Sequence, residues 1–265
     1  MEGKGTYIAI AIVAIVVFIA IVVVIITDSN SNNKKENITN NTINSTQQNT
    51  TSKTTDTFDY ESAAEEQMSE AKEGEEIAIM HVKGYGNITF KFFKNKAPKA
   101  VENFLTHARE GYYNGVKFHR VMEDFMIQGG DPKGDGTGGE SIWGTGFEEE
   151  IDKSLVPYRG ALCMASTGYG NSSLGSQFFI VQANADESMA SSLKNYGYSQ
   201  NLINQYLKYG GYLSLYKQYT VFGQVVDGMD VVDKIAKVEK KVSSSGELSV
   251  PVEDVIIESI DVTTK

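Results

Sequence analysis

The chain has 265 residues, enough for one substantial domain with appended segments. Its formal net charge is −10, and residues 1–58 contain four acidic and four basic side chains, so the whole excess lies in residues 59–265. An acidic domain of this kind is a poor candidate for binding nucleic acid or an anionic lipid surface.

Cysteine and histidine usage argues against disulfide and metal chemistry. The single cysteine, Cys163, has no partner for an internal disulfide. Its apolar context, ALCMA, predicts a buried strand thiol rather than a nucleophile. The three histidines, His81, His107 and His119, lie apart, with neither an HxxxH spacing nor a cysteine partner. We therefore expect no metal site.

Residues 1–27 predict a transmembrane anchor. The twenty residues from Tyr7 to Ile26 carry no charge, and as a helix rising about 1.5 Å per residue they would span about 30 Å of hydrocarbon. A cleaved signal peptide is the alternative, but it would have a shorter apolar run and a small-residue cleavage site. By analogy with export anchors we expect a single-pass cell-membrane protein with its domain outside the cytoplasm. Lys34 and Lys35, just after the span, do not favour this orientation.

Residues 28–74 predict a linker. Of the 31 residues from Asp28 to Phe58, 20 are Asn, Ser or Thr, so apolar side chains are too sparse to offset chain entropy. Asp59–Glu76 is rich in Glu and Ala and predicts a short, solvated helix. The folded domain is expected to span residues 75–265.

A hairpin and a helix open the predicted domain. Ile77–Val82 alternates apolar and polar residues, and a glycine-containing turn leads into Ile88–Phe93, as in a β-hairpin. Pro98 predicts the first turn of a helix that runs to Glu110, because the missing N–H of proline is not needed there.

Short β-like runs and glycine-rich loops make up the remainder. The predicted strands are Val116–Met122, Phe125–Gln128, Gly160–Ala165, Gln177–Gln182, Thr220–Val226 and Glu253–Val262. A second helix is predicted near Met229–Val238. Many short strands with two helices are typical of an all-β fold in which helices cap a β-barrel.

The segment Phe118–Gly139, FHRVMEDFMIQGGDPKGDGTGG, has the strongest functional pattern. It places Arg120, a fixed charge with five donors in a planar fork, beside Phe125 and Met126. Gln128 adds one amide donor and one acceptor group. Apolar side chains next to amide-binding groups suit a substrate with an apolar ring and a nearby amide, such as a prolyl peptide.

Further blocks identify a family. The ordered set FHRV, FMIQGGD, GTGG, MA, GSQFFI and VFGQV, between Phe118 and Val225, resembles the cyclophilin-type peptidyl-prolyl cis–trans isomerases. The resemblance covers about Glu75–Val262. It implies a closed eight-stranded antiparallel barrel with a helix over each end, and an isomerase that acts on proline-containing polypeptides without a cofactor.

The resemblance also implies residue roles. Arg120, Gln128 and Phe125 match the catalytic positions, with Arg120 facing the prolyl amide. The implied substrate-binding residues are Met126, Ala165, Ser166, Gln177, Phe179, Leu215 and Tyr219. Other aromatic residues of the same blocks are expected to be core: Phe118, Phe178 and Phe222. His119 is expected to face away from Arg120 in a structural role.

Two departures from the family pattern affect function. Many relatives have Trp and His where this chain has Ser214 and Tyr219, so we expect weak binding of cyclosporin-type macrocycles. Residues 184–213 form an insertion, in which Leu202–Tyr209 predicts an amphipathic helix. This helix either packs on the barrel or forms a tyrosine-rich lip that grips unfolded clients.

These patterns together predict a membrane-tethered, monomeric prolyl isomerase that assists the folding of extracytoplasmic proteins. The alternative is a cyclophilin-like module that binds proline-containing or unfolded chains with little catalysis.

Overall fold

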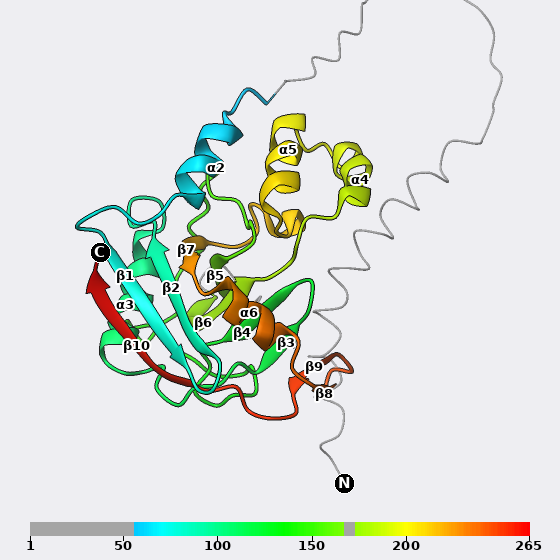
Figure 1. The fold of residues 1–265 in the computed structure, drawn as a ribbon. Helices are drawn as coiled ribbons and strands as arrows, with labels where there is room; N and C mark the ends of the chain where they lie inside the picture. Colours follow the sequence, from blue (N-terminus) through cyan, green and yellow to red (C-terminus); the bar gives the residue numbers. More distant parts are fainter. Residues whose placement is uncertain (1–55, 167–172) are drawn as a thin grey trace, which may run out of the picture. The chain divides into compact units, whose positions relative to one another are not determined.

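Eight antiparallel strands form the main sheet of the computed structural model, which describes residues 56–166 and 173–265. Their order across the sheet is β10-β1-β2-β7-β5-β6-β4-β3 (Figure 1). The strands are β1 (Glu76–Val82), β2 (Gly86–Phe92), β3 (Arg120–Met122), β4 (Met126–Gly129), β5 (Ala161–Ser166), β6 (Leu174–Val181), β7 (Val221–Asp227) and β10 (Ile257–Thr264). Each strand lies at or near a predicted one.

The two edge strands of this sheet, β3 and β10, are linked by hydrogen bonds between the segment before β3 and residues at and just before the start of β10. The Phe118 N–H donates to the Val255 carbonyl at 2.9 Å, and the Ile257 N–H donates to the Val116 carbonyl at 2.9 Å. Because these residues bond to the segment before β10, the predicted strand Val116–Met122 is shortened to β3. The described residues form an antiparallel half-barrel with helices, and the expected closure by a continuous strand ladder is not seen among them.

The strand register divides the side chains between two apolar clusters. Residues paired across β3, β4, β6 and β5 that belong to the main core are Val121, Ile127, Ile180 and Leu162. Residues one position along these strands belong to a second cluster: Met122, Met126, Phe179 and Cys163. Successive strand residues point to opposite faces, so both faces of the central strands are apolar.

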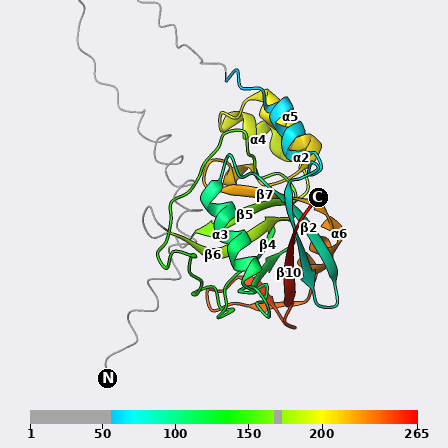
Figure 2. The same cartoon turned by 90° about the vertical axis from the view of Figure 1, so that its left-hand side faces the viewer.

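Helices α3 (Pro98–Arg109) and α6 (Met229–Ala236) lie on opposite sides of the strands (Figure 2) and supply apolar residues to the main core. Phe104 of α3 packs its ring 5.4 Å from that of Phe178 and 5.5 Å from that of Phe222. Phe118, Phe178 and Phe222 are fully buried, which confirms their assignment to the core.

Two adjacent glutamates connect a loop to α3 and to β7. Glu150 accepts hydrogen bonds from the backbone N–H groups of Lys99 (3.1 Å) and Ala100 (2.9 Å). A carboxylate is favourable at this helix N-terminus, which has no side-chain cap of its own. Glu149 accepts from the Thr220 N–H and hydroxyl at 2.6 and 2.5 Å. Burial nevertheless raises the pKa of Glu149.

The segment before β1 is not a solvated helix. Helix α2 (Tyr60–Met68) buries one face, including Tyr60, Ala64 and Gln67. The Gln67 side chain donates to the Val156 carbonyl at 2.7 Å and accepts from the Val156 N–H at 2.9 Å. The predicted solvated helix is therefore wrong for one side of α2. The few apolar residues of the helix and Gln67 lie on this side, and they pack against a loop distant in sequence. Helix α2, which precedes the predicted domain start at residue 75, therefore packs against residues of that domain.

The insertion contains α4 (Ala190–Asn195) and α5 (Gln200–Tyr209), with 3-10 turns at Glu187–Met189 and Leu213–Leu215. Figure 1 shows α5 beside α2, and both contribute to a third apolar cluster. Tyr206 is buried and Tyr196 is exposed. At Gly211 an added Cβ would lie 2.3 Å from the Pro157 carbonyl oxygen, so glycine is required there. The arrangement favours the packed helix over a lip.

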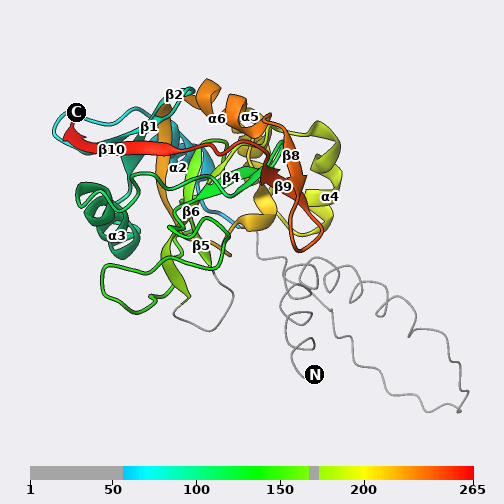
Figure 3. The same cartoon turned by 90° about the horizontal axis from the view of Figure 1, so that it is seen from below.

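A small hairpin was missed by the sequence analysis. Strands β8 (Lys240–Val242) and β9 (Leu248–Pro251) pair with each other (Figure 3), and β9 packs against β3. The serine-rich sequence between them, SSSGE, is typical of a loop, and each strand is too short to show an alternating pattern.

No helix in residues 56–166 or 173–265 is long and apolar enough to cross a membrane. The predicted anchor (residues 1–27) and the linker up to residue 55 lie outside the described residues.

We predict that Gln67→Ala lowers the free energy of unfolding by about 1–3 kcal/mol, because it leaves the buried N–H of Val156 without a partner and removes one of the two donors to the Val156 carbonyl. Urea unfolding of the full-length chain measures the change. Glu65→Ala, on the exposed face of α2, is the matched control. Equal stability of the two variants would show that Gln67 does not anchor the helix.

We also predict a pH-dependent contribution from Glu149. Because its pKa is raised in the folded state, the native protein holds this proton over a pH range in which the unfolded chain has lost it. Stability from this group is therefore greatest at low pH and declines as pH rises through the folded pKa. In urea titrations from pH 4 to 8, the stability of wild type relative to Glu149→Gln should fall with pH. Glu148→Gln, at the exposed neighbouring position, is the control for the substitution itself, and a rise of this relative stability with pH would refute the prediction.

Candidate active site

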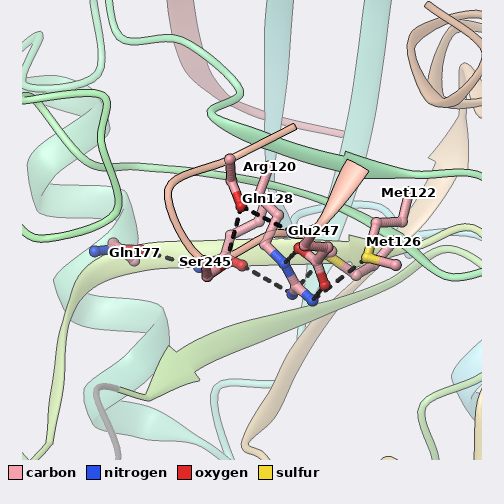
Figure 4. Close-up of polar contacts among 8 residues, drawn as sticks. Arg120, Met122, Met126, Gln128, Gln177, Ser245 and Glu247 are labelled. Atoms are coloured by element: carbon pink, nitrogen blue, oxygen red, sulfur yellow. Dashed lines mark hydrogen bonds and ion pairs between the residues drawn. The ribbon is translucent and has the colours of Figure 1, made fainter. Parts of the chain in front are cut away.

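A line of polar side chains crosses β3, β4 and β6 (Figure 4). Arg120 lies opposite Gln128 in the register, and its Nη1 donates to Gln128 Oε1 at 3.4 Å. Gln128 Nε2 donates to Gln177 Oε1 at 3.0 Å. Gln177 Nε2 in turn donates to the carbonyls of Gly136 and Gly138 at 3.1 and 2.8 Å. The three predicted polar residues therefore form one hydrogen-bonded chain that ends on the glycine-rich loop.

The predicted apolar residues gather beside this chain. One cluster contains six of them, namely Phe125, Met126, Ala165, Phe179, Leu215 and Tyr219. The Arg120 Cζ lies 5.7 Å from the centroid of the Phe125 ring, within the range of a cation–π contact. The rings of Phe179 and Tyr219 meet edge to face at 5.4 Å. The arrangement places one cation at the edge of an apolar surface.

Ser166 occupies the end of β5, directly after Ala165. Its Oγ lies 2.6 Å from the Oγ of Ser173, and its backbone pairs with Leu174. It does not belong to the apolar cluster.

Burial sets the ionisation of two neighbours. It lowers the pKa of His119, whose Nδ1 has no hydrogen-bond partner among the described residues. It raises the pKa of the Cys163 thiol, which is fully buried, as predicted. Both groups are therefore neutral at pH 7, whereas the guanidinium of Arg120 is a fixed positive charge beside the cluster.

The region that departs from the family pattern lies next to the cluster. Ser214 is exposed, whereas Leu215 and Tyr219 are half-buried. Burial raises the pKa of the Tyr219 hydroxyl, so the side chain stays neutral and presents an aromatic wall.

The sequence analysis missed three residues of this site. Tyr212 packs its ring 4.6 Å from that of Phe125. The Met122 sulfur lies 3.4 Å from Arg120 Nη2. Glu247 makes an ion pair with Arg120, with Oε2 2.6 Å from Nε. Met122 could have been found from its position two residues after Arg120 on one strand face, but no local signal connects Glu247 to this site.

A polar hollow of about 380 Å³ lies elsewhere, lined by residues that include Glu66, Lys91 and Lys96. Lys91 Nζ donates to the Glu66 carbonyl at 2.9 Å within it. The hollow contains no residue of the predicted site, and its charged lining does not suit a prolyl ring.

Comparisons with known proteins agree with this geometry. A family model described as "Cyclophilin type peptidyl-prolyl cis-trans isomerase/CLD" matches residues 77–262. A Staphylococcus aureus (strain USA300) protein named "Putative peptidyl-prolyl cis-trans isomerase" is 46% identical over 194 residues, covering 73% of this chain and 94% of the relative. A Staphylococcus saprophyticus protein with the same name is 44% identical over 197 residues, covering 74% of this chain and 96% of its own.

Solved structures give the same result. The crystal structure of a Cryptosporidium parvum cyclophilin-type peptidyl-prolyl cis–trans isomerase, determined in the presence of the dipeptide Ala-Pro, is 30% identical in sequence, with a TM-score of 0.55. The match covers 71% of this chain and 99% of that one. The family match and the relatives each span more than two thirds of the chain, and the matched residues include the whole polar chain and apolar cluster. The chain therefore belongs to the cyclophilin-type peptidyl-prolyl cis–trans isomerase family.

Proposed function

We propose that this protein catalyses rotation about X–Pro peptide bonds, with Arg120 as the central catalytic residue. The observation that carries the proposal is the position of the Arg120 guanidinium at the edge of the apolar cluster, 5.7 Å from the Phe125 ring. A prolyl ring needs an apolar surface, and its amide nitrogen needs a donor. The two requirements are met side by side.

The chemistry follows from the amide bond. Resonance gives the X–Pro bond a rotational barrier of about 20 kcal/mol, and rotation breaks no covalent bond. A donor aimed at the prolyl nitrogen interacts with the lone pair that becomes localised when the amide twists. Arg120 would therefore bind the twisted amide better than the planar one, which is the condition for catalysis. Each ~1.4 kcal/mol of such preference gives about a tenfold rate increase.

The remaining site residues divide by chemistry. Phe125, Met126, Phe179, Leu215 and Tyr219 would contact the prolyl ring. Gln128 and Gln177 are hydrogen-bonded to one another and to the glycine-rich loop, and they would hold the substrate backbone and orient Arg120. Ala165 and Ser166 would receive the residue before proline through their backbone.

The cellular setting is a separate part of the proposal. The uncharged run from Tyr7 to Ile26 supports a membrane anchor, and the polar linker supports a tethered domain. We propose that the domain lies outside the cytoplasm, acts as a monomer, and accelerates slow X–Pro steps in the folding of polypeptide clients there.

A binding module with little catalysis is the second candidate. Ser214 and Tyr219 favour it, because both differ from the residues that many relatives have at these positions. The intact chain from Arg120 through Gln128 to Gln177 favours the enzyme.

We predict that Arg120→Ala lowers the isomerisation rate of a short X-Pro peptide about 10²-fold or more, because the electrostatic donor is lost. Exchange NMR with the full-length chain in detergent micelles measures the rate. Arg120→Lys keeps the charge without the planar fork, so its isomerisation rate should lie between those of wild type and Arg120→Ala. Arg109→Ala, which removes an exposed arginine of α3, is the control. No acceleration by the folded wild-type protein would favour the binding module.

We also predict that cyclosporin-type macrocycles bind weakly, with dissociation constants above about 1 μM, because exposed Ser214 offers no indole contact. Ser214→Trp should tighten binding about tenfold or more, equivalent to about 1.4 kcal/mol. Titration calorimetry measures both, with Ser191→Trp on the exposed face of α4 as the control. Submicromolar binding by the wild-type chain would refute the prediction.

A further inference from the structure

The β8–β9 hairpin brings a carboxylate to the catalytic arginine. Glu247 is the last residue of the turn that joins the two strands, and β9 packs against β3, the strand that carries Arg120. The two residues are 127 positions apart in sequence. Their contact therefore exists only because the hairpin folds onto the edge of the main sheet.

The contact between the two side chains is bidentate. Arg120 Nε donates to Glu247 Oε2 at 2.6 Å, and Arg120 Nη2 donates to Oε1 at 2.8 Å (Figure 4). Both side chains are about two thirds covered, with exposed fractions of 34% and 32%. A planar pair of this kind fixes orientation as well as charge. Arg120 is a strong enough partner to lower the pKa of Glu247, so the carboxylate is ionised at neutral pH.

The other end of the guanidinium has only weaker partners. Nη1 lies 3.4 Å from Gln128 Oε1 and 4.0 Å from the sulfur of Met126, a member of the apolar cluster, while the Met122 sulfur lies 3.4 Å from Nη2. Glu247 thus occupies the Nε–Nη2 edge of the fork, while Nη1 is left with a long hydrogen bond to Gln128. An amide nitrogen of a bound substrate can compete with these long contacts far more readily than with the carboxylate.

The turn holds Glu247 in place. The Ser243 N–H donates to the Glu247 carbonyl at 2.8 Å, and the Glu247 N–H donates to Ser243 Oγ at 3.2 Å. Gly246 adopts φ +89°, a left-handed conformation that glycine accepts without strain. The backbone of the carboxylate-bearing residue is therefore fixed on both sides.

We propose that Glu247 is a positioning residue for the isomerase reaction, which holds the Arg120 guanidinium by its Nε–Nη2 edge so that Nη1 faces the prolyl amide. The proposal rests on the proposed function of Arg120. Arginine has several rotatable bonds, and a guanidinium that is about one third exposed would populate several rotamers without this partner. Since catalysis depends on the donor meeting the twisted amide, loss of this orientation reduces the rate more than it reduces peptide binding.

A competing mechanism predicts the opposite effect of removing Glu247. If the carboxylate competed with substrate for the guanidinium, removing Glu247 would accelerate isomerisation or tighten peptide binding. The two mechanisms therefore predict changes of opposite sign in the same measurement.

The test compares Glu247→Ala, Glu247→Gln and Glu247→Asp in the full-length chain, with Glu239→Gln as the matched control. Glu239 is an exposed glutamate just before β8, so its replacement removes the same charge from the same hairpin. Exchange NMR at several X-Pro peptide concentrations gives kcat and KM separately. The ¹⁵N resonance of Arg120 Nε, assigned by its loss in Arg120→Lys, reports the contact directly.

We expect Glu247→Ala to lower kcat about tenfold with KM changed less than about twofold. Glu247→Gln keeps one acceptor oxygen, and Glu247→Asp keeps the charge. Their kcat values should therefore lie between those of Glu247→Ala and wild type. The Arg120 Nε resonance should move in all three variants and stay unchanged in Glu239→Gln.

Two results would overturn the proposal. One is a kcat in Glu247→Ala that equals or exceeds that of wild type, and the other is a loss of activity that comes entirely from KM. Thermal unfolding of each variant identifies a loss that results from misfolding, in which case Glu247→Gln and Glu247→Asp decide. If the wild-type chain itself gives no exchange, the proposed function fails, and the Nε resonance still shows whether the contact forms.

Discussion

The register across β3, β4, β6 and β5 is the constraint on which the rest of this structure depends. Because side chains alternate between the two faces of a strand, one set of paired residues builds the main core and the next set builds the candidate site. A slip of one residue would bury Arg120 in the core and expose Ile127. The large buried core, with Phe104, Phe178 and Phe222 at its centre, therefore also fixes the position of the Arg120 strand.

A charge at the edge of an apolar surface needs partners that hold it without neutralising its function. Here the partners differ on the two sides of the guanidinium. A carboxylate from the β8–β9 hairpin binds one edge at hydrogen-bonding distances below 3 Å, whereas an amide oxygen and a sulfur contact the other at 3.4 and 4.0 Å. This asymmetry gives the guanidinium one fixed side and one side that can exchange its partner for substrate.

The elements outside the barrel strands form a second layer of support. Helix α2 and the insertion helix α5 share an apolar cluster, and Gln67 connects that cluster to the Val156 backbone. The insertion also delivers Tyr212, directly after Gly211, to the Phe125 ring. Segments that appear to be appendages in the sequence are therefore continuous with one wall of the candidate site.

The sequence by itself determined the family, most strands, both capping helices and the grouping of the site residues on β3, β4 and β6. It could do so because these features depend on local sequence patterns. The alternation of side chains along a strand determines which residues share a face, and Pro98 marks the start of a helix. Phe178 and Phe179 illustrate this, since the sequence assigned adjacent residues to core and site, and they belong to different clusters.

Only the tertiary structure decided which distant segments meet. The buried face of α2 depends on a loop 89 residues away, and the partner of Arg120 lies 127 residues along the chain. Glu247 sits in a serine-rich turn between strands of three and four residues, which are too short for any periodicity to reveal them. Contacts of this kind depend on how segments distant in sequence pack together in space. No pattern within either segment indicates which other segment it will contact.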